Sequence, residues 1–283
     1  MMRPVSENAG QDILRGVAMA VLAFSLSVFL PIVGFVFALF IPLPVLFYRV
    51  KGGRKSGAVV AAVSGALMAL LLGGPAWGDG LFFGGLLLLG LALGDGIDRG
   101  MTVERTFLMA CGLVLGGGTT LVLFHAGLSG VDLAPFVSDY IRGNLELSLR
   151  LYGEMGVPPE QIEAVRSVLD VLHRTLVRLL PALIVSSTML VAWATLIMAL
   201  QLFRIRGVAA SDPGPLNRWR APDPLIWGVI GCGVLLMFPD AGLKLAGLNG
   251  LIVLLTVYFF GGIAVVSYFF EKRRLPLALR FLL

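Results

Sequence analysis

Long apolar runs, separated by short polar stretches, set the pattern of this 283-residue chain. Each run comes close to the roughly 20 residues that an α-helix needs to cross about 30 Å of hydrocarbon. Because backbone N–H and C=O groups in hydrocarbon must pair within their own segment, each run is expected to be helical. The pattern predicts an all-α bundle of about eight transmembrane helices, at residues 13–30, 33–48, 58–72, 81–93, 106–126, 181–203, 225–238 and 248–270.

Residues 127–180 form the one sizeable polar interruption and predict an amphipathic helical hairpin. Its first half, residues 132–152, is amphipathic, with Gly143 expected as a weak point. Pro158 and Pro159 form a helix start signal. Apolar residues then recur at three- and four-residue steps: Ile162, Val165, Leu169, Leu172, Leu176 and Leu179. The hairpin is expected outside the cytoplasm, either as an interfacial packing element or as a lid over an outward-facing cavity.

The basic residues indicate the orientation of the chain in the membrane. With eight spans, one face of the membrane carries Arg3, Arg15, Arg49, Lys51, Arg54, Lys55, Arg99, Arg105, Arg204, Arg206, Arg218, Arg220, Lys272, Arg273, Arg274 and Arg280. Because Lys and Arg accumulate in cytoplasmic loops, both termini and a linker at 204–224 are expected in the cytoplasm. We therefore predict a single transmembrane domain over residues 1–283.

The amino-acid composition is also typical of an integral membrane protein. Apolar residues make up 58% of the sequence and charged residues 14%, whereas soluble domains carry roughly 25% charged residues. The net charge of +5 is spread over short clusters between apolar runs, so the lipid bilayer is the expected partner and nucleic acid is not. Cys111 and Cys232 both lie inside apolar runs and are interpreted as buried thiols, without a metal site or a cofactor.

Small residues at four-residue spacing predict where helices pack closely. Such side chains let two backbones approach each other in lipid, where the hydrophobic effect does not drive association. The set comprises Gly57, Ala61, Gly65 and Ala69, then Gly90 with Gly94, and Gly112 with Gly116. Packing inside the bundle is favoured over a dimer interface.

No catalytic motif is present in the sequence, and the protein is not expected to be an enzyme. The segment from Gly94 to Gly100 superficially resembles the opening of a lipid-headgroup transferase motif. Asp98 occupies the alanine position of that motif, however, and the downstream aspartates are missing. The segment is therefore interpreted as a solvated cytoplasmic turn, with Asp98 and Arg99 facing water.

Five polar or aromatic residues near the outer membrane face form a hypothetical ligand-binding set: Trp77, Asp79, Asp240, Lys244 and Asn249. They adjoin short spans interrupted by Gly or Pro, and interrupted spans mark ligand sites in transporters. In this hypothesis Trp77 stacks on the ligand while the other four residues orient it. The alternative is a pair of ordinary turns, with Asp240 paired to Lys244 and Trp77 acting as an interfacial anchor.

The C-terminal third carries a resemblance to a known family. The segment 247–251 (GLNGL), followed by 258–266 (YFFGGIAVV), resembles the last span of the YybS-like family of bacterial inner-membrane proteins. That family is distantly similar to the S components of energy-coupling factor transporters, which hold a small solute in an outward-facing pocket. The resemblance implies a solute-binding role here, although S components commonly have about six spans and no distinctive ligand motif carries over.

These observations favour a membrane-embedded subunit that binds and helps to transport a small-molecule ligand. Because the sequence contains no nucleotide-binding motif, active transport would require separate ATPase and coupling subunits. The alternative is a non-transporting membrane scaffold or regulatory partner. It would work through the basic loops, the outer hairpin and the 204–224 linker, whose Arg218, Trp219 and Arg220 suit docking or lipid headgroups.

Overall fold

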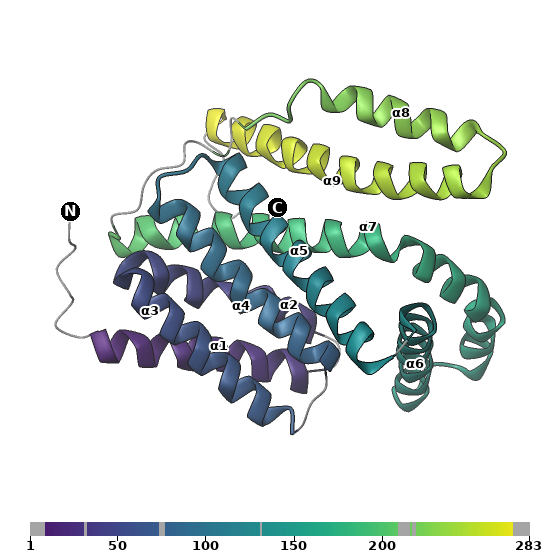
Figure 1. The fold of residues 1–283 in the computed structure, drawn as a ribbon, viewed down its shortest axis with the longest axis horizontal. Helices are drawn as coiled ribbons and strands as arrows, with labels where there is room; N and C mark the ends of the chain where they lie inside the picture. The colour runs from purple at the N-terminus through teal and green to yellow at the C-terminus, as the bar shows by residue number, and fades with distance from the viewer. Residues whose placement is uncertain are drawn as a thin grey trace. The chain divides into compact units, whose positions relative to one another are not determined.

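The computed structural model describes residues 9–30, 33–73, 77–130, 132–208, 216 and 219–273. Over these residues the chain forms nine α-helices and no strand, which confirms the all-α prediction (Figure 1). The helices are α1 (Ala9–Phe29), α2 (Gly34–Ala38), α3 (Pro42–Leu71), α4 (Trp77–Asp98), α5 (Val103–Ser129), α6 (Leu133–Glu154), α7 (Pro159–Arg206), α8 (Leu225–Met237) and α9 (Ala241–Lys272).

Six helical stretches in the described part of the chain are long and apolar enough to cross a membrane: Gly10–Phe29, Gly34–Leu71, Gly78–Asp98, Val103–Ser129, Pro159–Arg206 and Ala241–Phe270. The apolar helix Leu225–Met237 is shorter. The prediction of several apolar helices of membrane-spanning length is therefore confirmed, and it agrees with a multi-pass membrane protein. The sequence pattern gave eight separate spans because it divided Gly34–Leu71 in two and counted α8.

Helix α3 turns back on itself at Gly53. This residue has φ 83° and ψ −177°, a conformation open to glycine, and it separates two helical arms. A Cβ atom built on Gly57 would lie only 2.8 Å from the Cα atom of Arg49, whereas residues eight apart in a straight helix are separated by about 12 Å. The arms 42–52 and 54–71 therefore lie against each other.

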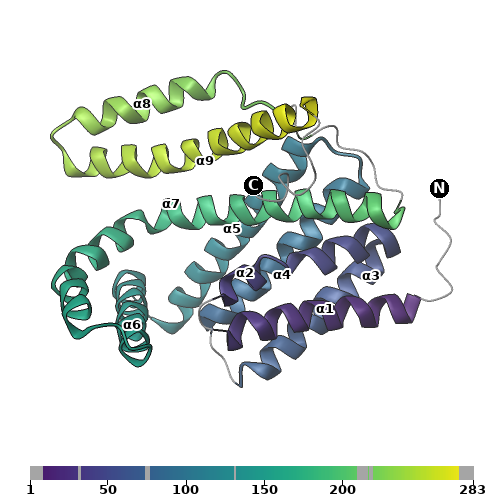
Figure 2. The same cartoon turned by 180° about the vertical axis from the view of Figure 1, so that it is seen from behind.

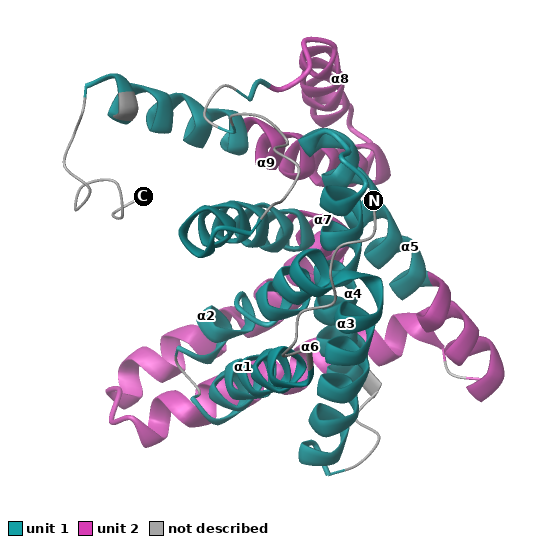
Figure 3. Ribbon diagram, turned by 90° about the vertical axis from the view of Figure 1, so that its left-hand side faces the viewer, with its two compact units in different colours: residues 1–119, 187–220, 259–283 teal, residues 120–186, 221–258 magenta. Residues whose placement is uncertain are grey.

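The chain divides into two compact units, coloured separately in Figure 3. Unit 1 comprises residues 1–119, 187–220 and 259–283, and unit 2 comprises residues 120–186 and 221–258. The single domain over residues 1–283 remains a prediction.

In unit 1, α1, both arms of α3 and α4 pack side by side, as Figures 1 and 2 show from opposite sides. Phe24 of α1 meets Phe83 of α4 edge to face, with ring centroids 4.6 Å apart. Gly90 and Gly94 bring α4 against α3, since Cβ atoms at these positions would collide with Pro42 and Arg49 respectively. Gly65 faces Leu87, and Ala61 is buried while Ala69 is exposed. By contrast, Gly112 and Gly116 of α5 face open space among the described atoms.

In unit 2, α6 and the beginning of α7 occupy the region where the sequence predicts a hairpin. Helix α6 runs without a break through Gly143, so the weak point expected there is wrong. Helix α7 begins at Pro159, as the start signal predicts, and continues through Pro181 to Arg206 as one helix of 48 residues. The sequence pattern separates the hairpin from the next span at this proline, whereas the structure joins them.

Helix α8 and the first part of α9, up to residue 258, form the other part of unit 2 and pack through glycines. A Cβ atom on Gly228 would lie 3.1 Å from Leu254, and one on Gly250 would lie 2.7 Å from the Cys232 sulfur. Helix α8 agrees closely with the predicted span at 225–238, whereas α9 begins seven residues earlier than predicted.

Candidate functional site

The residues of the predicted ligand-binding set belong to two different units. Trp77 and Asp79 lie in the first turn of α4 in unit 1, where Asp79 is exposed. The side chain of Trp77 lies outside the described part of the structure. Asp240, Lys244 and Asn249 lie in unit 2. A common site for all five residues remains a prediction.

Asp240 acts as the N-cap of α9. One of its carboxylate oxygens accepts a hydrogen bond from the backbone N–H of Leu243 at 2.8 Å. This satisfies one of the free N–H groups at the start of a helix. Among the described ion pairs none joins Asp240 to Lys244, although the backbone N–H of Lys244 donates to the Asp240 carbonyl at 3.1 Å.

Asn249 connects α9 to α7 at the position of Pro181. Its side-chain oxygen accepts from the backbone N–H of Ala182, and its side-chain nitrogen donates to the carbonyl of Arg178, both at 3.1 Å. These two backbone groups would bond to each other in an undisturbed helix. The second N–H of the amide donates to Leu245 within α9 at 2.9 Å. Both amide N–H groups are thus used, and Asn249 supports the proline-containing turn of α7.

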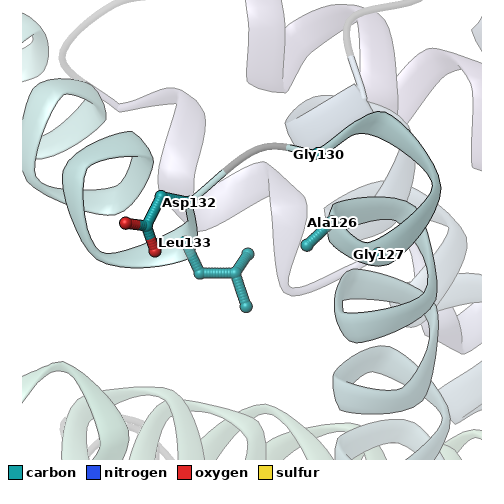
Figure 4. A pocket seen from close by; sticks show the side chains of 5 residues that line it. All are labelled: Ala126, Gly127, Gly130, Asp132 and Leu133. Carbon is teal, nitrogen blue, oxygen red and sulfur yellow. The ribbon is translucent and has the colours of Figure 1, made fainter.

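A shallow, open pocket of about 540 Å³ lies in unit 2, where α5 ends and α6 begins (Figure 4). Its lining consists of Ala126, Gly127, Gly130, Asp132 and Leu133. None of the predicted ligand-binding residues lines this pocket. The pocket has one carboxylate and few side chains that could contact a ligand, so it provides few groups for specific binding.

Arg49 is the buried centre of a charge cluster in unit 1. Only 4% of this residue is exposed. Its guanidinium donates to both Asp95 and Asp98 of α4, with a distance of 3.1 Å to Asp98. Arg99 pairs with the second oxygen of Asp95 at 2.5 Å. The cluster fastens the first arm of α3 to the end of α4.

The interpretation of residues 94–100 as a solvated turn is correct in part, since Arg99 and Gly100 form a turn and Asp98 and Arg99 are exposed. Residues 94–98 are helical, and Asp98 accepts from the buried Arg49. Arg99 has a side chain that is 53% exposed, but it is paired with Asp95. The sequence holds a signal for this cluster, since an arginine and two carboxylates adjoin apolar runs, but it does not indicate which charges meet.

A second charged contact lies nearby in unit 1. The ammonium group of Lys51 contacts both carboxylate oxygens of Asp12, at 2.8 and 2.7 Å. Asp12 is 8% exposed and belongs to the start of α1. Because Lys51 lies two residues before Gly53, this contact joins α1 to the turn of α3.

Four aromatic rings form a cluster inside unit 1. The rings of Trp193 and Phe260 stack with centroids 4.8 Å apart and planes 13° apart. Trp219 lies 5.2 Å from Trp193 at an angle of 59°. Phe107 meets Trp193 and Phe260 edge to face, at 6.0 and 5.9 Å. We call these four residues the aromatic cluster.

The aromatic cluster contains two unsatisfied donors. The indole N–H groups of Trp193 and Trp219 are both buried, and neither has a hydrogen-bond partner among the described atoms. Trp193 is 4% exposed. A buried donor without an acceptor costs roughly 1–3 kcal/mol, so a pair of neighbouring ones is unusual for residues that serve packing alone.

Trp219 was expected in a cytoplasmic linker at 204–224, available for docking. In the structure its ring packs against Trp193 within unit 1, so it is not a free docking residue. Arg218 and residues 209–215 of the same linker lie outside the described residues. Sequence reasoning missed the aromatic cluster because its members come from four segments that are distant along the chain.

Comparison with known proteins identifies a family for the chain. No curated protein and no solved structure matches it. The chain belongs to the family described as "Predicted membrane protein (DUF2232)", whose sequence model matches residues 17–283.

Proposed function

We propose that this membrane protein binds a small solute, and that the aromatic cluster of unit 1 is the binding site. The observation that carries the proposal is the pair of buried indole N–H groups, on Trp193 and Trp219, for which the described atoms supply no acceptor. Each can donate to a carbonyl or carboxylate oxygen. Because Trp193 and Phe260 already stack on each other, a flat apolar body would contact Trp193 where the ring of Trp219 now lies, 5.2 Å away.

In this proposal a solute enters beside Trp193 and takes the position that Trp219 now occupies. Trp193, Phe260 and Phe107 all come from helices, whereas Trp219 lies on irregular backbone. Of the four rings, Trp219 therefore moves at the lowest conformational cost. An oxygen of the solute accepts from the Trp193 N–H, which removes the unsatisfied donor and adds to the affinity.

Transport is the wider role proposed for the protein. The resemblance to YybS-like proteins and to S components supports it, and that resemblance itself stays a prediction. Since the sequence lacks a nucleotide-binding motif, separate ATPase and coupling subunits would supply the energy. The ligand set of Trp77, Asp79, Asp240, Lys244 and Asn249 stays a hypothesis for an outer entry site.

The proposed topology retains eight crossings, both termini in the cytoplasm and an extracytoplasmic hairpin at 127–180. The reversal at Gly53 supports it, because α2 with the first arm of α3 (residues 34–52) and the second arm (residues 54–71) each come close to the roughly 20 residues that a crossing needs. Counting the shorter α8 as a crossing brings the total to eight. Reporter fusions at the two termini and at Gly156, between α6 and α7, test the arrangement. Termini on opposite faces would contradict it.

A scaffold or regulatory role is the alternative, and one observation favours it. The interior of unit 1 is filled, with Val45, Leu46 and Leu93 fully buried. A filled interior suits a rigid partner protein as well as a binding subunit. Stable co-purification of a non-transport protein, together with no bound small molecule, would support this alternative.

The decisive experiment uses tryptophan variants of the purified protein. The chain has four tryptophans, and Trp227 provides a matched control because it is 73% exposed and lies outside the aromatic cluster. Small molecules extracted from the wild-type protein are identified by mass spectrometry and then titrated back while indole fluorescence is followed. Trp193→Phe should weaken binding at least about tenfold, the equivalent of roughly 1.4 kcal/mol for a lost hydrogen bond, and Trp227→Phe should leave it unchanged. Equal binding by all three proteins, or no recovered molecule, would contradict the proposal.

A further inference from the structure

One end of unit 1 gathers exposed cations from three helices. Lys51, Arg54 and Lys55 surround the turn at Gly53, Arg15 comes from α1, and Arg206 ends α7. We call these five residues the Gly53 face. Arg15, Lys51 and Arg206 all act electrostatically on Tyr48, and Arg54 acts on Asp95, so the cations lie around the same end.

The carboxylates near this face are already occupied. Asp12 is paired with Lys51, and Asp95 and Asp98 are held by Arg49. Among the described residues no ion pair involves Arg15, Arg54 or Arg206. Arg15, Arg54 and Arg206 of the Gly53 face therefore carry positive charge that no carboxylate in the described part of the chain neutralises through an ion pair.

The position of these cations along their helices indicates what neutralises them. Arg54 begins the second arm of α3, Arg15 precedes the apolar part of α1, and Arg206 is the last residue of α7. The ends of membrane-crossing helices lie at the depth of the lipid headgroups. Long basic side chains at helix ends extend toward that layer, where the phosphates of anionic lipids lie.

We infer that the Gly53 face binds the headgroup phosphates of anionic phospholipids in the adjoining leaflet. The inference is independent of the proposed function, because it uses neither the aromatic cluster nor transport. Lipid phosphate is favoured over an acidic protein since the cations sit beside apolar helical surface, which the acyl chains of the same lipid would cover.

The test measures thermal unfolding of the full chain in neutral detergent. Added phosphatidylglycerol should raise the melting temperature in a dose-dependent way, whereas phosphatidylcholine and inorganic phosphate should not. The effect should shrink as salt increases, a readout that needs no variant. The variant Arg15→Gln/Arg54→Gln/Lys55→Gln should weaken the apparent affinity by about fivefold for each cation removed.

The control variant removes three arginines from unit 2, as Arg150→Gln/Arg166→Gln/Arg174→Gln, and should respond to phosphatidylglycerol like the wild type. Equal stabilisation by phosphatidylcholine would overturn the inference, as would a full response to inorganic phosphate or an unchanged response of the Gly53-face variant. Binding of a poly-glutamate peptide without any binding of phosphatidylglycerol would also overturn it, in favour of an acidic protein partner.

Discussion

The side-chain amide of Asn249 in α9 donates to the backbone carbonyl of Arg178 in α7, at 3.1 Å. The same amide accepts from Ala182, so it bridges the two backbone groups around Pro181. A proline inside a membrane helix needs neighbouring groups of this kind, because water cannot satisfy the backbone there. Asn249 therefore stabilises the internal packing of unit 2.

Replacing Asn249 should destabilise the protein. Asn249→Ala removes the bridge and leaves Arg178 and Ala182 without this partner, at a cost of about 1–3 kcal/mol in unfolding free energy. Thermal unfolding in detergent measures the loss. Asn144→Ala is the matched control, because its amide bonds only to Tyr140 within its own exposed helix turn, and the expected change is within about 0.5 kcal/mol.

A double-mutant cycle tests the connection to Pro181. Pro181→Ala lets α7 restore its own hydrogen bond between Ala182 and Arg178. The cost of Asn249→Ala should then shrink by at least about 0.5 kcal/mol. Additive effects of the two substitutions would show that Asn249 acts independently of the proline.

Removing Arg49 should be more damaging than removing an exposed arginine. Arg49→Ala removes the buried guanidinium from Asp95 and Asp98, whose carboxylates are partly exposed. The loss of these charged hydrogen bonds should cost about 1.5–3 kcal/mol. Arg142→Ala breaks an exposed pair with Glu146 and should cost at most about 1 kcal/mol. Thermal unfolding of both variants provides the comparison.

A rescue variant separates charge from packing at this position. Asp95→Asn/Asp98→Asn in the Arg49→Met background removes all three charges together, and much of the lost stability should return. Failure to recover any stability would indicate that the arginine acts through its shape rather than through its charge.

Two glycines at helical packing positions should respond in opposite ways to alanine. At Gly57 a Cβ atom would lie 2.6 Å from the Cβ of Arg49, so Gly57→Ala forces the two arms of α3 apart and costs about 1–3 kcal/mol. At Gly112 nothing lies within 4 Å among the described atoms. Gly112→Ala should be neutral or should stabilise the helix by up to about 1 kcal/mol, as measured by thermal unfolding.

The turn of α3 should depend on glycine at position 53. A φ of 83° with ψ near 180° is strained for any residue with a Cβ, and Gly53→Ala should cost about 1–3 kcal/mol. Gly80→Ala serves as control, since Gly80 lies in the first turn of α4 and no described atom lies within 4 Å of a Cβ built there. An equal effect of both substitutions would contradict the role assigned to the Gly53 turn.

The helices themselves could be predicted because lipid imposes a length on every apolar run. Helix α8 follows its apolar run almost residue by residue, and the Pro159 start of α7 follows from the start signal. Pro181 was expected to open a new span, since proline usually ends a helix. It lies inside α7 because Asn249, 68 residues later, satisfies the backbone around it, and no local pattern reveals that partner.

The contacts of the polar and aromatic side chains were harder to predict than the helices. Asn249 was assigned to a ligand because a polar residue near an interrupted span is typical of transporters, but its hydrogen bonds go to the backbone. Arg49 was placed in a loop, because the distribution of Lys and Arg along the chain indicates which side of the membrane a segment faces. It does not indicate whether a given side chain is buried. The pairing of Trp193 with Trp219 depends on a tertiary fold that brings separate segments together.

The reversal at Gly53 also bears on how the chain is made. Lys51, Arg54 and Lys55 flank the turn, and positive charges of this kind resist transfer across the bilayer during synthesis. The arms on either side are therefore expected to enter the membrane together, as a preformed helical pair whose tip stays on the ribosome's side. A single glycine, by allowing the polypeptide to reverse direction, would then determine how many times this segment crosses the bilayer.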